Sequence, residues 1–134
     1  QMNKKTIIVD LPETWAEFPS EGSGRIYRPQ YMDAGTMRVY LMPPTDHDNV
    51  LIALSEQTES LGMPLGEQIH CEITKGALGA VATMLRKIPG VGLVQFWLLK
   101  CEITIFALHE MGNLETIHSE LKQASEIIHN IHFE

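Results

Sequence analysis

The closing stretch of the chain, Leu114 to Phe133, constrains the fold most, because its apolar residues recur with the period of a helix. They are spaced by three or four residues, at Leu114, Ile117, Leu121, Ala124, Ile128 and Ile131. This spacing places them in one narrow stripe of a helix. The other sides carry residues that we expect to be solvated, namely Glu115, Glu120, Lys122, Gln123 and Glu126. The stripe therefore predicts a helix over about residues 114–131 that covers an apolar surface.

The earlier part of the chain predicts a β-sheet as that surface. Its short runs are rich in Val, Ile, Thr and aromatic residues, with strands expected over 6–11, 25–28, 36–42 and 68–75. The run 36–42 alternates, with Met37, Val39 and Leu41 on one face and Arg38 and Tyr40 on the other. Short connections containing Gly and Pro favour an antiparallel meander of the first strands. We expect Trp15 and Phe18 to lie in a loop that closes one edge of the core.

Three later segments complete the expected fold. Residues 46–61 keep a helical stripe, with Thr45 and Asp48 in the positions of a capping box and Gly62 at the end. Residues 76–87 fit a helix and a strand equally well by period, and two early glycines favour the strand. Residues 93–111 are too long for one strand, so we expect a hairpin that breaks near 100–102.

Length and charge limit the classes of function. The 134 residues fit a single domain, 1–134, and the formal net charge of -7 disfavours nucleic acid and anionic membranes as partners. Near the start only Ile7 to Val9 are consecutively apolar, and no run is long enough for a membrane-spanning helix. We therefore expect a cytoplasmic protein without membrane insertion. Cys71 and Cys101 are expected to be buried thiols of a reducing compartment, with a single disulfide as the alternative.

The sequence predicts neither a metal site nor a cofactor. His129 and His132 could share an ion with a third ligand such as Glu126, but Glu126 points to another side of the predicted helix. The acidic residues of Asp46–Asp48 suit a helix start better than a hydrolase site. The residues Gly22–Gly24 lack the spacing of a nucleophile elbow, and no pair of glycines forms a phosphate loop.

One set of residues on the early strands predicts a binding site. Arg25 and Tyr27 on one strand could lie beside Arg38 and Tyr40 on the next, on one face, with Arg28 nearby. Arginine and tyrosine are overrepresented at binding hot spots. In an acidic chain this set would suit a carboxylate or an acidic peptide, and ordinary solvated sheet positions are the alternative.

Several local features resemble one known superfamily. They are residues 11–15 after the first strand, 25–28 and 35–39 as the next two, 96–99 late in the sheet and 127–133 at the end. Together with the order of elements, they resemble the superfamily of the photosystem protein PsbP, a yeast Ran-binding nucleotide-release factor and small bacterial proteins. The resemblance implies an α+β fold in which helices flank an antiparallel sheet on both sides, and proteins that mostly hold other proteins. Several bacterial members look like secretion-associated chaperones or accessory factors.

These observations lead to one preferred function and two alternatives. We expect a non-enzymatic accessory or chaperone-like factor that binds a protein or peptide through the face or edge bearing Arg25, Tyr27, Arg38 and Tyr40. The first alternative is a small-molecule-binding protein or enzyme with a pocket near His109 and Arg38, in which His109 could also act as the base for a Cys71 nucleophile. The second is a structural subunit, and the sequence is compatible with a homo-oligomer.

Overall fold

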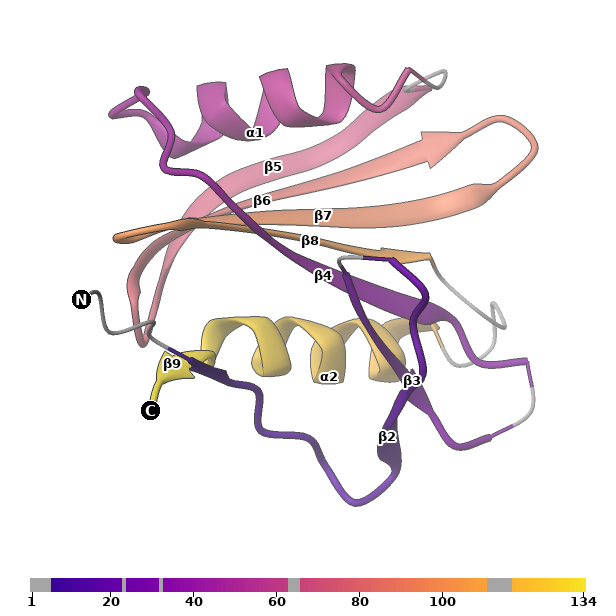
Figure 1. The fold of residues 1–134 in the computed structure, drawn as a ribbon. Coiled ribbons are helices and arrows are strands. Elements are labelled where there is room, and N and C mark those ends of the chain that lie inside the picture. Colours follow the sequence, from indigo (N-terminus) through magenta and orange to yellow (C-terminus); the bar gives the residue numbers. More distant parts are fainter. Residues whose placement is uncertain (1–5, 23, 32, 63–65, 111–116) are drawn as a thin grey trace.

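The protein is an antiparallel sheet with one helix on each face (Figure 1). The computed structural model describes residues 6–22, 24–31, 33–62, 66–110 and 117–134. Helix α1 spans Val50–Glu59 and helix α2 spans Ile117–His129. The strands of the sheet are β2 (Trp15–Phe18), β3 (Arg25–Pro29), β4 (Thr36–Met42), β5 (Glu67–Gly76), β6 (Gly79–Ile88), β7 (Gly92–Lys100) and β8 (Thr104–Glu110). Their order across the sheet is β2-β3-β4-β8-β7-β6-β5, and this arrangement confirms the predicted α+β class.

The two ends of the chain meet in a second, small sheet. Strand β1 is only Ile7–Ile8 and pairs antiparallel with β9, His132–Phe133. The amide of Glu134 also donates to the carbonyl oxygen of Thr6 at 2.9 Å. The expectation of a longer first strand over 6–11 in the main sheet is therefore wrong, because the start of the chain pairs with its end.

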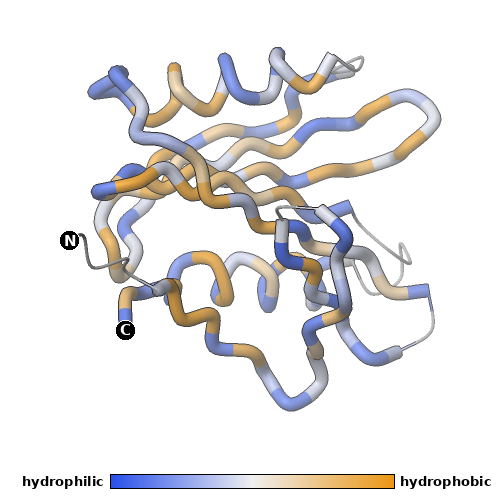
Figure 2. Tube along the Cα trace, viewed as in Figure 1, coloured by the Kyte–Doolittle hydropathy of each residue, from blue (hydrophilic) through white to orange (hydrophobic). Residues whose placement is uncertain are grey.

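Helix α2 covers one face of the sheet and, with the residues that follow it, buries the described part of the predicted stripe from Ala124 onward. Ala124, Ile127, Ile128 and Ile131 are at most 2% exposed and pack against Trp97 and other residues of the sheet. Figure 2 shows hydrophobic residues concentrated along the middle strands of the sheet. The helix ends close to the turn between β5 and β6, where a Cβ on Gly76 would lie 2.8 Å from the carbonyl oxygen of His129. The predicted residues 114–116 lie outside the described part of the chain.

Helix α1 covers the opposite face, over β5, β6 and β7. Val50, Ala53 and Leu54 are buried there. The helix is shorter than expected, and its N-cap is Asn49, whose Oδ1 accepts from the amide of Leu51 at 2.9 Å. Thr45 accepts instead from the amide of His47 in the preceding turn, so the predicted capping box with Asp48 is wrong. Asparagine serves as well as threonine at this position, and here it directly precedes the helix.

The remaining strands include one correction and two confirmations. Trp15–Phe18 forms β2 rather than a loop, because it pairs along its whole length with β3. The ambiguous segment 76–87 is a strand in its larger part, β6. The long apolar stretch is a hairpin of β7 and β8 that turns at residues 101–103, as predicted. No helix among the described residues is long and apolar enough to cross a membrane.

The cysteines differ from expectation in their exposure. Both are free thiols, but Cys71 is exposed and Cys101 is half-buried. Cys71 lies on β5, which is the terminal strand of the sheet and is exposed over most of its length. An alternating apolar pattern does not reveal whether a strand lies in the middle of a sheet or at its edge, so the prediction of two buried thiols is wrong.

Candidate functional site

The four residues predicted to form one site lie on two different faces of the sheet. In the β3–β4 ladder Arg25 is opposite Val39 and Tyr27 is opposite Met37, whereas Arg38 is opposite Ile26. Directly opposed residues of an antiparallel pair project to the same face. Arg25 and Tyr27 therefore face α2, and Arg38 and its neighbour Tyr40 face the side of α1 (Figure 1).

The pair on the α2 side is not available to a partner. Tyr27 is 1% exposed within the core. Its burial raises its pKa above the usual 10.0, and the nearby Arg25 guanidinium only partly opposes this rise. Arg25 is half-buried and its Nη1 donates to the carbonyl oxygen of Ile7 at 3.5 Å. The expectation that these four residues share one face is wrong, because it depended on a register that the sequence does not specify.

The pair on the α1 side belongs to a partly exposed surface, which we call the open face. It consists of Phe18, Ile26, Arg28, Arg38 and Tyr40. Helix α1 lies over β5, β6 and β7 and reaches the Met42 end of β4, so among the described residues no helix covers the β2 and β3 part of this side. Three consecutive ladders align a row of side chains across it: Phe18, Ile26, Arg38 and Leu108. Arg38 is the charged member of an otherwise apolar row.

The open face is hollowed on both sides of the Tyr40 ring. One hollow, of ≈ 470 Å³, is lined by Ile26, Arg38, Tyr40, Gly24 and the residues 19–22. A second, of ≈ 460 Å³, continues past Tyr40 to Phe106 and to Leu61 after the end of α1. Gly24 is required here, because an added Cβ would lie 2.5 Å from the Tyr40 ring. The two hollows therefore adjoin the same side chain, Tyr40, and together we call them the groove of the open face.

The charge of the open face is opposite to that of the whole chain. The Arg28 guanidinium lies 5.8 Å from the centre of the Phe18 ring, within the range of a cation–π contact, and its Nη2 donates to the carbonyl oxygen of Ala34 at 3.4 Å. Neither Arg28 nor Arg38 forms an ion pair with an acidic side chain in the described part of the chain. Two arginines are thus presented on a chain with a net charge of -7.

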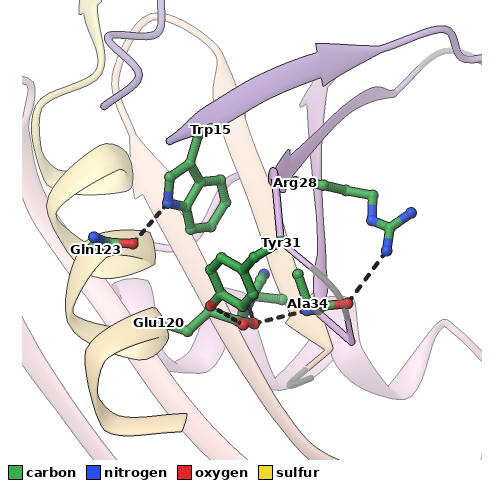
Figure 3. A network of polar contacts seen from close by, with 8 residues as sticks. Trp15, Arg28, Tyr31, Ala34, Glu120 and Gln123 are labelled. Carbon is green, nitrogen blue, oxygen red and sulfur yellow. Dashed lines mark hydrogen bonds and ion pairs between the residues drawn. The ribbon is translucent and has the colours of Figure 1, made fainter. Parts of the chain in front are cut away.

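The other side of the same strands holds a buried polar cluster (Figure 3). Glu120 of α2 is 1% exposed, and its Oε2 accepts from His109 Nε2 at 2.5 Å and from the amide of Gly35 at 3.0 Å. Its Oε1 accepts from the Tyr31 hydroxyl at 2.6 Å. One turn further along the helix, the Gln123 side chain accepts from Trp15 Nε1 at 2.9 Å. The cluster fixes the first turns of α2 against β8, β2 and the loop between β3 and β4.

The cluster keeps Glu120 ionised in spite of its burial. Burial alone raises the pKa of this carboxyl. Hydrogen bonds from His109, Tyr31 and the Gly35 amide, together with the electrostatic interaction with His109, outweigh it, so the pKa lies below the usual 4.5. Glu120 also lies in the first turn of α2, where the helix dipole favours a negative charge. The arrangement resembles a catalytic acid–base pair, but both side chains are enclosed and neither lines a hollow formed by the described residues.

The predicted solvation of Glu120 and Gln123 is therefore wrong. Glu120 lies four residues before Ala124 and eight before Ile128, so the helical period itself places it on the buried stripe. Its charge argued against that position. The buried partner His109 could not be assigned from sequence, because it lies on a strand whose neighbours were not known.

Two expected combinations of residues are separated by the sheet. His109 is opposite Met37 and faces α2, whereas Arg38 is opposite Leu108 and faces away. A pocket shared by His109 and Arg38 is thus excluded by the register. Cys71 lies on β5, three strands from β8 and on the face opposite His109, so the two cannot form a nucleophile and base.

The histidines near the end of the chain have other partners. His129 Nε2 lies 2.6 Å from the hydroxyl oxygen of Thr74, and its Nδ1 lies 2.7 Å from the carbonyl oxygen of Ser125. His132 Nδ1 lies 3.0 Å from the carbonyl oxygen of Asn130. His47 in the segment before α1 pairs with Glu56 of that helix. Across the described ranges, no three His, Cys, Asp or Glu side chains group closely enough to hold a metal ion.

Comparisons with known proteins find structural similarity without a match in sequence. No family model matches the sequence, and no curated protein matches it. The Ran-binding protein Mog1p of Saccharomyces cerevisiae has a TM-score of 0.66 at 9% identity, over 96% of this chain and 95% of that one. A point mutant of Mog1 gives 0.65 at 11% identity, over 98% and 96%. LpqN of Mycobacterium tuberculosis, involved in cell envelope biogenesis, gives 0.59 at 11%, over 97% and 84%.

These identities are too low to carry residues or activities from one chain to another. The comparisons do establish the architecture, because the structural similarity extends over nearly the whole of this chain. The chain has the fold of Mog1p, which is the fold that the resemblance to the PsbP-like superfamily implied.

Proposed function

We propose that this chain is a non-enzymatic binding protein that holds an acidic segment of another polypeptide on its open face. The observation that carries the proposal is the position of Arg38. It is the charged member of an apolar row and borders a shallow hollow together with Ile26 and Tyr40. The likeness to a Ran-binding protein supports the class of protein-binding factors. A chaperone-like role linked to secretion is a more specific form of the proposal and rests on the family resemblance alone, whereas a cytoplasmic location rests on the short apolar runs of the sequence.

The geometry favours a polypeptide over a small molecule. The groove is open and runs from residues 19–22 past Tyr40 to Leu61, whereas sites for small ligands usually enclose most of the ligand. Carboxylates of a bound segment would accept paired hydrogen bonds from the Arg38 guanidinium. Apolar side chains would pack on Ile26, Tyr40 and Phe106. The adjacent edge strand β2 can also receive an added strand through its outer backbone groups.

A selection from a random displayed-peptide library tests this proposal. Peptides that bind the wild-type chain should be enriched in Asp and Glu next to apolar residues, and their affinity should fall with added salt. Arg38→Glu should weaken a selected peptide at least about tenfold, because an approaching carboxylate would meet a like charge. The matched control is Lys122→Glu, which makes the same change in net charge on the exposed side of α2.

Two results would contradict the proposal. The first is a selection that yields basic peptides or no consensus. The second is a set of acidic binders that lose affinity equally with Arg38→Glu and Lys122→Glu, which would show an effect of net charge and not of the open face.

A further inference from the structure

The other edge of the sheet, formed by β5, is long and exposed. The strand has ten residues, and those from Glu67 to Ile73 are all exposed. Two isoleucines stand out, because Ile69 is 50% exposed and Ile73 is 49% exposed. No described strand pairs with the outer side of β5. Natural proteins usually protect such an edge, since its unpaired backbone groups can accept another strand.

The protection on β5 is partial. A β-bulge interrupts its ladder with β6 between Gln68 and His70. A bulge bends and twists the strand locally, which discourages pairing before that point. From His70 to Gly76 the ladder is regular, with successive residues opposite Leu85 down to Gly79. The regular part includes the exposed Cys71 and Ile73.

The residues of β5 complement a second copy of themselves. Two identical strands that pair antiparallel are related by a two-fold axis perpendicular to the sheet. Side chains of the same face lie opposite each other only when this axis passes between the two copies of one residue, on which the register is then centred. Centred on Cys71, the register places His70 opposite Glu72, twice by symmetry, within the regular part of the strand, whereas position 69, opposite Ile73, lies in the bulge. His70 and Glu72 project to the same side, since their side chains already lie 3.4 Å apart within one strand.

Neighbouring registers lack this match. Centring on Glu72 opposes two glutamates directly, which is unfavourable. Centring on Ile73 opposes Cys71 to Lys75, and centring on His70 opposes Ile73 to Glu67. The Cys71 register alone among these places a histidine opposite a glutamate within the regular part of the strand.

We propose that two copies of this chain pair antiparallel through their β5 edges, with the two Cys71 residues facing each other at the two-fold axis. The two sheets then join into one, and both α1 helices lie on the same side. The open face is at the opposite end of each sheet, so the proposal is independent of peptide binding there.

Sedimentation of the full chain under reducing conditions tests the dimer. We expect a monomer–dimer equilibrium over micromolar to near-millimolar concentrations, and a monomer throughout that range for Ile73→Lys. The matched control is Ile52→Lys, because Ile52 is also 49% exposed and lies on α1, not on the β5 edge. This variant should dimerise like the wild type. A wild-type monomer at all concentrations, or equal loss of the dimer in both variants, would overturn the proposal.

Disulfide trapping tests the register. In a Cys101→Ser background, the azo oxidant diamide should join two chains: each Cys71 thiol gives up one proton and one electron, and diamide is reduced to the hydrazine. Opposed residues have Cα atoms about 4.5–5.5 Å apart, within the range of a disulfide. Cysteine moved to position 72 in Cys71→Ser would face residue 70 of the partner copy and should cross-link at least about tenfold more slowly. Equal or faster cross-linking from position 72 would show the register to be wrong.

Discussion

Two consecutive pairs in the ladder between β4 and β8 place charge in opposite environments. Met37 pairs with His109 on the side of α2, and there Glu120 is enclosed and hydrogen-bonded. Arg38 pairs with Leu108 on the other side, where it forms no ion pair with a described acidic side chain. The difference indicates that one side of these strands fixes the position of a helix, while the other side carries a charge that forms no ion pair among the described residues.

The buried pair specifies position more than it adds stability. Removing the Glu120 carboxylate from water costs several kcal/mol, and the hydrogen bonds that it accepts do little more than offset that cost. Once it is buried, however, any arrangement of α2 that separates Glu120 from its donors leaves an unpaired charge. His109, Tyr31 and Gly35 lie on β8 and in the loop between β3 and β4, so one carboxylate aligns α2 with both.

Loss of the Glu120 charge should have the largest effect. We expect Glu120→Gln to lower the free energy of unfolding by about 3 kcal/mol, because it leaves buried donors without a charged acceptor. Urea unfolding followed by tryptophan fluorescence measures this change, since Trp15 is buried beside the His109 ring. Glu126→Gln on the exposed side of α2 is the control and should change stability by less than about 0.5 kcal/mol. Equal effects of the two variants would remove the distinction between the faces.

Protonation of Glu120 at low pH should lower the stability less than Glu120→Gln does, because a protonated Glu120 can still form a neutral hydrogen bond. The folded-state pKa of Glu120 lies below its usual 4.5, so this group stabilises the fold fully above that pH. Its contribution is lost as the pH falls through the lower folded-state value. The difference in unfolding free energy between wild type and Glu120→Gln should therefore decrease below pH 4.5. Urea titrations of both chains at neutral and acid pH measure it, and a constant difference would contradict the assigned pKa direction.

The sequence predicted individual elements better than their pairing. Thr36–Met42 was predicted with the observed bounds, because alternation over one strand is a local signal. The prediction that Arg25 and Tyr27 share a face with Arg38 and Tyr40 was wrong, because it depends on the register between β3 and β4. That register depends on a connection in which Asp33 has a φ of 61° and Gly35 is bound by Glu120 of α2. A contact across 85 residues of sequence thus positions the candidate site, and no local pattern contains it.

The smallest change in stability is expected at the open face, where the change in binding should be largest. Arg38 is partly exposed and has no acidic partner among the described residues, so Arg38→Glu should alter the free energy of unfolding by less than about 0.5 kcal/mol. Urea unfolding and peptide binding measured on the same preparation test both halves of this expectation. Glu120→Gln provides the reverse case, because it should destabilise the chain yet leave peptide affinity unchanged while the chain stays folded. A loss of stability in Arg38→Glu comparable to that in Glu120→Gln would mean that Arg38 supports the fold. The loss of peptide binding in Arg38→Glu would then no longer identify the open face as the binding surface.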